Sequence, residues 1–487
     1  RACREFEVSE REGTLSVMRI RGRNSSWKQV RIGAPDASLT GASGMSAVTE
    51  LVDKLGLVEA LDGHVPAIKT RARGLSAGEL VLAVTCTQLL GHDALVGLDR
   101  VRADVAGQEL WPVAAPASTT TGALARRFTA AHLVGIEDAI AAVTSRWLRL
   151  LPARVRSPLV LRSPTIDLDS TEVEVFGRAK HGVAYNYVGQ RAGRPHLASW
   201  AEAGLPLAAD LLAGDQDVRP RCAGLLARAI ACLPAAVCAR PRVRADAGYF
   251  TAELAWAATG LGADYAVAAK RNSAFWRELA AVPAGAWCPA RDMHGAQVAV
   301  MDYAPAGWPP DAYTIVRRVR VDAGHISADG RSRRRRTIEA NQLALVLGGE
   351  ADHAWAVSFI VTNLPTTTPA DVVAVEHWFR GRTAIEERFR EAKLGAGLNH
   401  LPSGQAAVNT VWMWSALLAG AISVMLQSLT GLSDDAGTAR MHRLRHELLC
   451  VPARLIHHAR NLTLRLPPGD HPLAEVLSRI RALPDPA

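Results

Sequence analysis

The chain lacks the cysteine patterns that accompany structural zinc sites or a disulfide framework. Its seven cysteines are odd in number and scattered. None forms a CxxC pair, and no Cys/His group has zinc-ligand spacing. We therefore expect free thiols in a reducing compartment. A secretory signal is not indicated either, because the first residues, RACREFEVSEREG, contain no apolar core.

Long hydrophobic runs are also missing. The longest nearly apolar run, Val411–Leu426, is too short for a membrane span and contains Ser415 and Ser423. It predicts a buried helix. Membrane insertion is therefore not part of the expected function.

Acidic residues are not in excess, and basic residues outnumber them. The 487 residues carry a formal net charge of +9, and 49% of them are hydrophobic. At roughly 150 residues per domain, this length predicts two to four domains with a large buried core. A positive charge favours an anionic partner, most often nucleic acid in proteins of this size. Arginine dominates the basic residues, which suits bidentate phosphate contacts or reflects a GC-rich genome.

The first 150 residues predict a mainly helical N-terminal domain. Residues 1–44 are polar and weakly periodic, which indicates short strands or an ordered tail. Ser46–Leu61 and Ser76–Leu90 then carry apolar residues at helical spacing, and Ser76 with Glu79 fits a capping box. Such a domain binds DNA, supports dimerisation, or is a plain packing module.

Residues 151–282 predict the first part of a mixed α/β core. The segment 164–212 reads as an antiparallel meander. In Thr165–Val175 the apolar parity flips, which predicts a bulge or tight turn near Ser170. A second short strand, Val243–Asp246, ends in an acidic residue and is followed by a helix.

Residues 283–365 predict a β-rich insertion, with alternation in four segments that include Leu343–Leu347. The insertion contains a cationic loop, Arg331–Arg336, that either grips the DNA backbone or is merely solvated. Residues 366–430 predict the second part of the core, and residues 431–487 a helical C-terminal region.

The stretch Trp378–Lys393, WFRGRTAIEERFREAK, places one acid among three cations on a predicted helix. Arg382, Glu386, Arg390 and Lys393 fall within about 80° of one another around the helix axis. One interpretation is a solvated ladder in which Glu386 pairs with Arg382 and Arg390. The other is a face that works together with two upstream acids.

Those acids are Asp169, at the strand irregularity, and Asp246, at a strand end. Strand ends next to helices are where α/β folds place ligands. Phosphoryl transfer on DNA uses two Mg²⁺ ions about 4 Å apart, which hard carboxylate oxygens can hold. Three carboxylates would meet that need.

The motifs IDLDST, RADAGYF and HWFRGRTAIEERFREAKLGAG together resemble bacterial insertion-sequence transposases of the DDE type. The similarity is to the group with a Y-(2)-R-(3)-E-(6)-K signature and a β-domain inserted before the glutamate. It implies an RNase H-like fold, with Asp169, Asp246 and Glu386 as catalytic residues and ligands of two Mg²⁺ ions, for which Mn²⁺ can substitute. Arg382 and Lys393 fall on the signature's R and K. Phe379 stands where the signature has Tyr, so the aromatic body remains and the hydroxyl is missing.

The resemblance further implies Mg²⁺-dependent cleavage and strand transfer at insertion-sequence ends, of the cut-and-paste type. The implied partner is double-stranded DNA, both element ends and target, bound by a homodimer. The implied location is the bacterial cytoplasm, in association with the nucleoid. The residues expected to contact DNA are Arg382, Lys393, Phe379, Arg390, Arg333, Arg334, Arg335 and Arg336.

Two alternative functions remain open, a catalytically silent DNA-binding protein and a stand-alone nuclease of the same fold. Glu387 is the alternative third acid, but it points about 100° away from Glu386. Asp167 either supports the site or pairs with a structural cation. Three tryptophans either stack a displaced base or belong to the core, and three cations either line the groove or serve the structure. These are Trp355, Trp378 and Trp412, and Lys180, Arg191 and Arg194.

Overall fold

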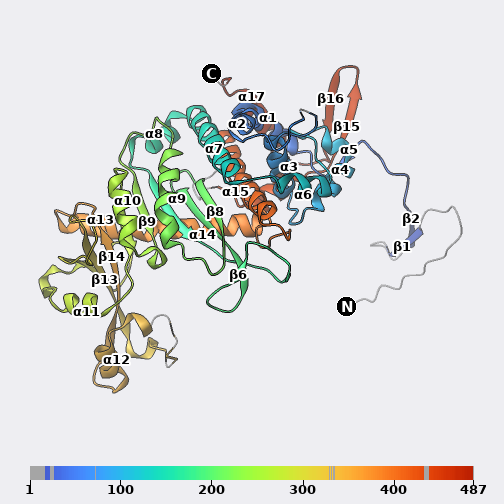
Figure 1. Ribbon diagram of the computed structural model, residues 1–487. Coiled ribbons are helices and arrows are strands. Elements are labelled where there is room, and N and C mark those ends of the chain that lie inside the picture. Colours follow the sequence, from blue (N-terminus) through green and yellow to red (C-terminus); the bar gives the residue numbers. More distant parts are fainter. Residues whose placement is uncertain are drawn as a thin grey trace.

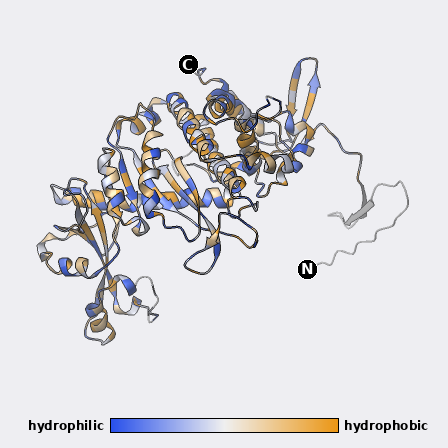
Figure 2. Ribbon diagram, viewed as in Figure 1, coloured by the Kyte–Doolittle hydropathy of each residue, from blue (hydrophilic) through white to orange (hydrophobic). Residues whose placement is uncertain are grey.

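The computed structural model describes residues 17–21, 27–71, 73–327, 329–330, 332, 335–432 and 438–485. The protein has a mixed α/β fold in which one large sheet extends from the helical N-terminal region to a smaller group of helices at the other end. Figure 1 shows the N-terminal helices at one end of the molecule and α12 at the other. In Figure 2 the hydrophobic colouring gathers on the sheet strands and on the long helix α15.

The N-terminal region is helical from residue 45 to residue 150, after the hairpin of β1 (Val17–Arg21) and β2 (Trp27–Arg31) and the short strand β3 (Leu39–Thr40). As predicted, α3 begins in a capping box, in which the side chains of Ser76 and Glu79 each accept a backbone N–H. The helices are α1 (Met45–Leu55), α2 (Leu57–His64), α3 (Ala77–Leu89), α4 (Gly97–Ala103), α5 (Val105–Gln108), α6 (Ser118–Ala125) and α7 (Ala130–Leu150).

The large sheet runs through both the predicted core and the predicted insertion. Its order is β11-β12-β13-β14-β10-β9-β4-β7-β5, with β6 and β8 also paired to β7. Strands β4, β9 and β10 are parallel, whereas β7 is antiparallel to β4, and β14 to β10. The insertion is therefore joined to the core by backbone hydrogen bonds. The strands are β4 (Thr165–Ser170), β5 (Val173–Glu174), β6 (Ala184–Tyr185), β7 (Arg191–Trp200), β8 (Leu205–Ala213), β9 (Arg242–Ala245), β10 (Asp264–Ala268), β11 (Cys288–Pro289), β12 (Ala296–Met301), β13 (Tyr313–Asp322) and β14 (His353–Thr362).

The predicted bulge near Ser170 is wrong. Strands β4 and β5 pair with β7 in one unbroken register, from Ser170 opposite His196 to Val173 opposite Gly193. The gap between them coincides with Pro195 on β7, which has no N–H to donate. The apolar parity flips because four consecutive residues of β4 are buried, as expected for a central strand covered on both faces.

The helices between residues 153 and 347 are α8 (Ala153–Leu161), α9 (Arg219–Ala231), η1 (Ala247–Tyr249), α10 (Ala252–Gly260), α11 (Ser273–Ala280) and α12 (Ala340–Leu347). The last one corrects the expectation of a strand at Leu343–Leu347. Its Leu343 and Val346 pack together in a small cluster at helical spacing. A short apolar run fits either period, and here packing selected the helix.

The predicted single helix over Trp378–Lys393 is divided into several pieces. Helix α13 (Pro369–Arg380) passes into the 3₁₀ turn η5 (Gly381–Thr383), then into α14 (Ala384–Arg390) and the π-helical turn η6 (Glu391–Gly395). The Arg244 guanidinium donates a hydrogen bond of 2.5 Å to the Trp378 carbonyl near the end of α13. The prediction that Arg382, Glu386, Arg390 and Lys393 share one helix face assumed 100° per residue from 379 to 393. The rotation per residue differs in the 3₁₀ turn and in the π turn, so that prediction does not hold.

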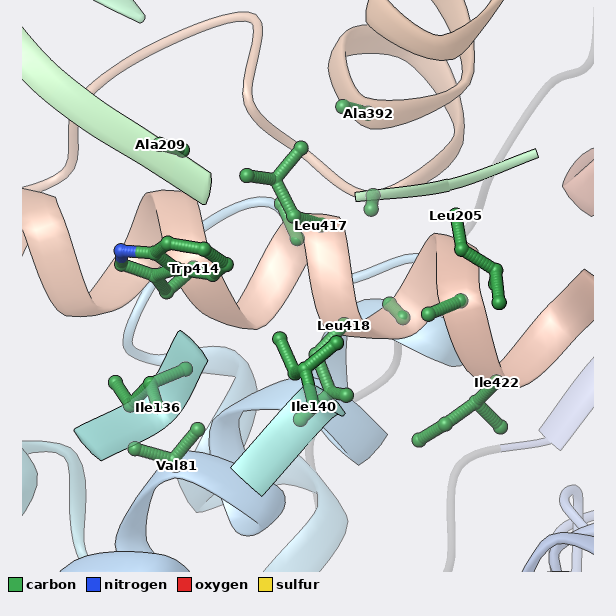
Figure 3. Packing of buried hydrophobic residues seen from close by; sticks show 14 of the residues in the cluster. Val81, Ile136, Ile140, Leu205, Ala209, Ala392, Trp414, Leu417, Leu418 and Ile422 are labelled. Carbon is green, nitrogen blue, oxygen red and sulfur yellow. The ribbon is translucent and has the colours of Figure 1, made fainter. Parts of the chain in front are cut away.

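Helix α15 (Ala406–Thr430) lies in the centre of the core. Figure 3 shows Trp414, Leu417, Leu418 and Ile422 of this helix between side chains of β8 and those of α3 and α7. By length and composition α15 could cross a membrane, but 89% of its most apolar window is buried inside the protein. The prediction of a buried helix is confirmed.

The C-terminal region was expected to be helical, but it also contains two strands. Between α16 (Met441–Leu444) with its π turn η7 (Arg445–Leu449) and α17 (Leu473–Arg481) lies a hairpin of β15 (Ala453–His458) and β16 (Asn461–Arg465). Strand β15 also pairs with β3, so the hairpin extends a small sheet at the N-terminal region. Ala453 and Leu455 are buried and Arg454 is exposed, an alternation with period two that is typical of a strand.

Candidate active site

Asp169 and Asp246 lie side by side at the ends of two parallel strands. The last paired residues of β4 and β9 are Leu168 and Ala245, and each is followed directly by an aspartate. Neighbouring strands are about 4.8 Å apart, so the register alone places the two carboxylates at the same edge of the sheet. The sequence predicted this pair from the two motifs.

The Asp169 carboxylate is largely buried, and neighbouring carboxylates repel its negative charge. Burial, followed by the negative charges of Asp246 and Glu386, raises the pKa of Asp169 to about 6. Its Oδ1 accepts a hydrogen bond of 2.8 Å from the Ser170 N–H, while Arg382 Nη1 stands 3.9 Å from Oδ2. The structure thus brings both Asp246 and Glu386 into electrostatic reach of Asp169.

Asp246 forms the N-cap of the 3₁₀ turn η1. Its Oδ1 accepts a hydrogen bond of 2.8 Å from the Gly248 N–H. A Cβ atom at Gly248 would lie 2.9 Å from that oxygen, so glycine is required for the loop to close on the carboxylate. This accounts for the DAG order in the second motif.

Helix α14 carries Glu386 on an exposed face. Its buried residues, Ile385 and Phe389, hold the helix in place, and the helix packs against β4. The predicted pairs of Glu386 with Arg382 and Arg390 are not formed. Arg390 instead contacts Glu387 at 2.8 Å, and Arg440 stands 3.3 Å from the same carboxylate. Among the described residues Glu386 has no hydrogen bond or ion pair, and its carboxylate remains available for a ligand.

A cleft of about 510 Å³ opens between the β4–β5 segment and α14 with its π turn. Asp169 and Glu386 lie in its wall together with Arg390 and Lys393, two of the predicted DNA contacts. Asp246 is not among the lining residues. The remaining lining residues are Ser170, Thr171, Glu172, Val173, Glu174, Phe389, Leu394 and Asn399.

Lys393 is held by the chain that follows Asp169. Its Nζ donates hydrogen bonds of 2.7 Å to Thr171 Oγ1 and to the Glu172 carbonyl. Burial lowers the pKa of Lys393. Because an ammonium has three donors, one is left for a phosphate.

Phe379 does not reach the cleft. Its side chain is 9% exposed and packs with Ile315, Ile360 and Val372 between α13 and the sheet. The predicted DNA contact of this ring is wrong, because the aromatic body is used for packing.

The four consecutive arginines at the end of the cationic loop, residues 333–336, fall into two pairs. Arg333 and Arg334 lie outside the described residues. Arg335 and Arg336 lie in the 3₁₀ turn η4 (Arg335–Thr337), and Arg335 Nη1 donates to the Ser327 carbonyl at 3.4 Å. Their contact with DNA stays a prediction.

A buried ion pair beneath the two aspartates was not foreseen in its details. Asp167 and Arg244 lie opposite each other on β4 and β9, joined by contacts of 2.6 and 2.8 Å. Arg244 also stacks 5.2 Å from the Trp378 ring centroid, and Trp378 Nε1 donates to Thr165 Oγ1. The alternative in which Asp167 pairs with a structural cation is confirmed. Arg244 stands two residues before Asp246, so both side chains point to the same face of the sheet, as do those of Asp167 and Asp169. This shared spacing is the signal that could have identified Arg244 as the partner of Asp167.

Tyr249 is a second residue that the sequence did not single out. It is 1% exposed, and its pKa is raised well above its ordinary value by burial and by the charges of Asp169 and Asp246. Its ring lies 5.6 Å from that of His196 on β7. Tyr249 and His196 therefore form a buried aromatic contact close to the two aspartates.

The family follows from a comparison of the sequence with family models. A model described as transposase DDE domain group 1 matches residues 23–328 and 343–485. This chain belongs to that family. The DDE transposase also matches a solved structure, a piggyBac transposase synaptic complex with hairpin DNA, at 8% identity and a TM-score of 0.38. That match covers 82% of this chain and 79% of the other. No curated protein matches.

DDE transposases generally use divalent metal ions. The donors available in this transposase are carboxylate oxygens, which suit hard cations, and the mutual repulsion that raises the pKa of Asp169 would be relieved by a dication. Within the part of the chain that the structure describes, no three His, Cys, Asp or Glu side chains are close enough to hold one ion. Mg²⁺ keeps several waters, so two carboxylates are enough.

The other aromatic and basic candidates of the transposase make contacts within the protein. Trp412 is 1% exposed, and Trp378 is held between Arg244 and Thr165. The Cζ atom of Arg318 lies 4.3 Å from the ring centroid of Trp355. The core interpretation of the tryptophans is therefore supported. Lys180 and Arg191 donate to backbone carbonyls, and Arg194 pairs with Glu172.

Proposed function

We propose that this protein is an active transposase that cleaves DNA at the ends of an insertion sequence and joins the freed ends to target DNA. The proposal includes a cut-and-paste pathway, Mg²⁺ as the metal and Asp169, Asp246 and Glu386 as the catalytic residues. The observation that carries it is the strand register, which sets Asp169 and Asp246 side by side. The charge of Glu386 acts on the same carboxylate.

In this proposal Asp169 and Asp246 hold the metal ions, and Glu386 completes the set from α14. The metals would activate the attacking oxygen and stabilise the leaving oxygen. Arg382 stands 3.9 Å from Asp169 and would turn to a phosphate near the reacting bond. Arg390 and the free donor of Lys393 would bind the flanking phosphates along the cleft.

Two features of the fold support an RNase H-like core. Strands β8, β7 and β4 are antiparallel neighbours, and β4 continues into the parallel strands β9 and β10. The acids follow the central strands, β4 and β9. The expected homodimer in the DNA complex remains a prediction, as does the role of the N-terminal helices in DNA binding or dimerisation.

The second candidate is a catalytically silent DNA-binding protein. It is favoured by one observation, that no described group of three acids is close enough to share an ion. A silent protein would bind DNA ends and leave them intact.

The deciding experiment uses purified protein and labelled DNA carrying the ends of the element that encodes it. We expect cleavage with Mg²⁺ or Mn²⁺, binding alone with Ca²⁺, and neither cleavage nor joining in EDTA. The Asp169→Asn variant should bind the ends and leave them uncut. Binding without cleavage by the wild-type protein in Mg²⁺ would establish the silent alternative, and cleavage at the normal rate in EDTA would exclude the metal mechanism.

A further inference from the structure

Three aromatic or phenolic side chains stand almost fully in solvent on the segment between β5 and β7. Phe176 is 87% exposed, Tyr185 68% and Tyr187 92%. Val188, next to the last of them, is 62% exposed. Figure 1 shows this segment around β6 projecting beyond the body of the fold. A cluster of exposed aromatics on a projecting segment marks a surface that binds something.

The two tyrosines point outward because the residue between them is anchored inward. Asn186 is 6% exposed. Its Oδ1 accepts hydrogen bonds from the N–H groups of Val188 and Gln190 at 3.0 and 2.8 Å, and Gly189, with φ +85°, closes the turn. Tyr185 ends β6, where neighbouring side chains point in opposite directions, and Tyr187 lies in the turn that the Asn186 side chain closes, so an inward Asn186 leaves both tyrosines in solvent.

The anchor connects this segment to the cleft. Asn186 Nδ2 donates to the carboxylate of Glu172, which also accepts from Arg194 at 2.7 Å. Glu172 lies in the cleft wall, three residues after Asp169, and its carbonyl is held by Lys393. The position of the tyrosines is therefore fixed relative to the candidate active site.

The charge of the segment indicates which kind of molecule it binds. Residues 176–191 contain Arg178, Lys180 and Arg191 and no acidic residue. Lys180 and Arg191 donate to the backbone carbonyls of Leu401, Gly177 and Lys180, so those bonds leave both cationic charges uncancelled. An anionic partner with flat faces fits best, and DNA has both properties. Only unpaired bases expose a free face for stacking.

We propose that residues 176–190, here named the aromatic hairpin, bind an unpaired stretch of DNA beside the cleft by stacking its bases on Tyr185, Tyr187 and Phe176. This inference rests on the proposed function, because it assigns the single strand that cleavage of an element end would release or expose. The cations of the hairpin hold the backbone of that strand, and the aromatic rings hold its bases.

The test compares binding of a labelled single-stranded oligonucleotide, containing one 2-aminopurine, with binding of the same sequence as a duplex. Tyr187→Leu removes the ring and keeps an apolar side chain, whereas Tyr187→Phe keeps the ring. We expect the leucine variant to weaken single-strand binding about tenfold and to abolish quenching of 2-aminopurine, with duplex binding and the salt slope unchanged. The phenylalanine variant should behave as wild type. Arg178→Gln should instead lower the salt slope by about 0.7.

Trp256→Leu is the matched control, because Trp256 is 50% exposed on α10 and lies outside the hairpin. It should leave single-strand binding unchanged. Wild-type-like single-strand binding by Tyr187→Leu and Tyr185→Leu, in a protein whose wild-type form binds and cleaves DNA, overturns the inference alone. So does a change of oligomeric mass in these variants without a change in DNA binding, which would make the hairpin a protein interface. Failure of the wild-type protein to bind either DNA overturns the proposed function and this inference with it.

Discussion

Asp167 and Arg244 form a buried two-point ion pair directly beneath the two aspartates of the site. Each stands two residues before an acid, Asp167 before Asp169 and Arg244 before Asp246, and the pair is matched across the β4–β9 ladder. Arg244 also binds the Trp378 carbonyl, near the end of the helix that leads to Glu386. One guanidinium therefore links the three chain segments that carry the acids.

Breaking this ion pair should destabilise the protein strongly. Arg244→Leu leaves the Asp167 carboxylate buried without its partner, and we expect a loss of about 3–5 kcal/mol of unfolding free energy. The double variant Asp167→Leu, Arg244→Leu should recover much of that loss, yet cleave DNA slowly because Trp378 has lost its contact. Thermal unfolding and single-turnover cleavage measure the two effects. An unchanged unfolding temperature in Arg244→Leu would contradict the structural role.

Glu386 and its neighbour Glu387 should differ sharply in catalysis. Glu386→Gln keeps the shape but removes the charge, and should lower the single-turnover cleavage rate about 10³-fold or more with end binding nearly intact. Glu387 is paired with Arg390 and Arg440. Glu387→Gln should therefore change the rate by less than about tenfold, near 1.4 kcal/mol. A dead Glu387→Gln enzyme beside a live Glu386→Gln enzyme would mean that Glu387 is the catalytic acid.

The stability of the protein should fall as pH rises through a window set by Glu137. This carboxyl on α7 is buried, contacts Arg228 at 3.0 Å and accepts from the Ala209 N–H at 3.1 Å. Burial raises the pKa of Glu137 from 4.5 to about 7, against the opposing effect of Arg228. The folded state therefore holds more protons than the unfolded state between these values, and stability decreases with rising pH across that range.

The Glu137→Gln variant removes this titration and should flatten the pH dependence of the unfolding temperature between about pH 5 and 7. The exposed neighbour supplies the control, since Asp138→Asn should retain the wild-type slope. If the Glu137→Gln variant keeps the full wild-type slope, another group is responsible.

Neutralising the cationic loop should weaken DNA binding without changing sequence preference. The change is Arg333, Arg334, Arg335 and Arg336 to Gln, in the segment before α12. Phosphate contacts carry little sequence information, so affinity for element ends and for unrelated duplexes should fall together, with a smaller salt slope. Binding titrations at several salt concentrations measure both. If affinity and slope stay unchanged, the loop is solvated and does not contact DNA.

Local patterns predicted most of the core strands and the capping box of α3, because each depends on residues close in sequence, whereas the pairing of the two aspartates joins two distant motifs. Asp169 and Asp246 were predicted as site residues because each lies near the end of a strand, and the β4–β9 register places them next to each other. Glu386 was found by spacing, although the helix around it is broken at Gly381. The burial of Phe379 was missed because it depends on β13 and β14 packing under α13, a contact that no local period reveals.

The central position of α15 has a consequence for how the chain is made. This helix begins at residue 406, yet it fills the space between β8 and the helices α3 and α7, which are synthesised much earlier. On the ribosome, those earlier elements must wait with apolar faces uncovered until α15, more than 250 residues after the end of α7, has emerged. Such late, long-range closure slows folding and leaves the nascent chain prone to aggregation. A message truncated before residue 406 would therefore yield an insoluble product.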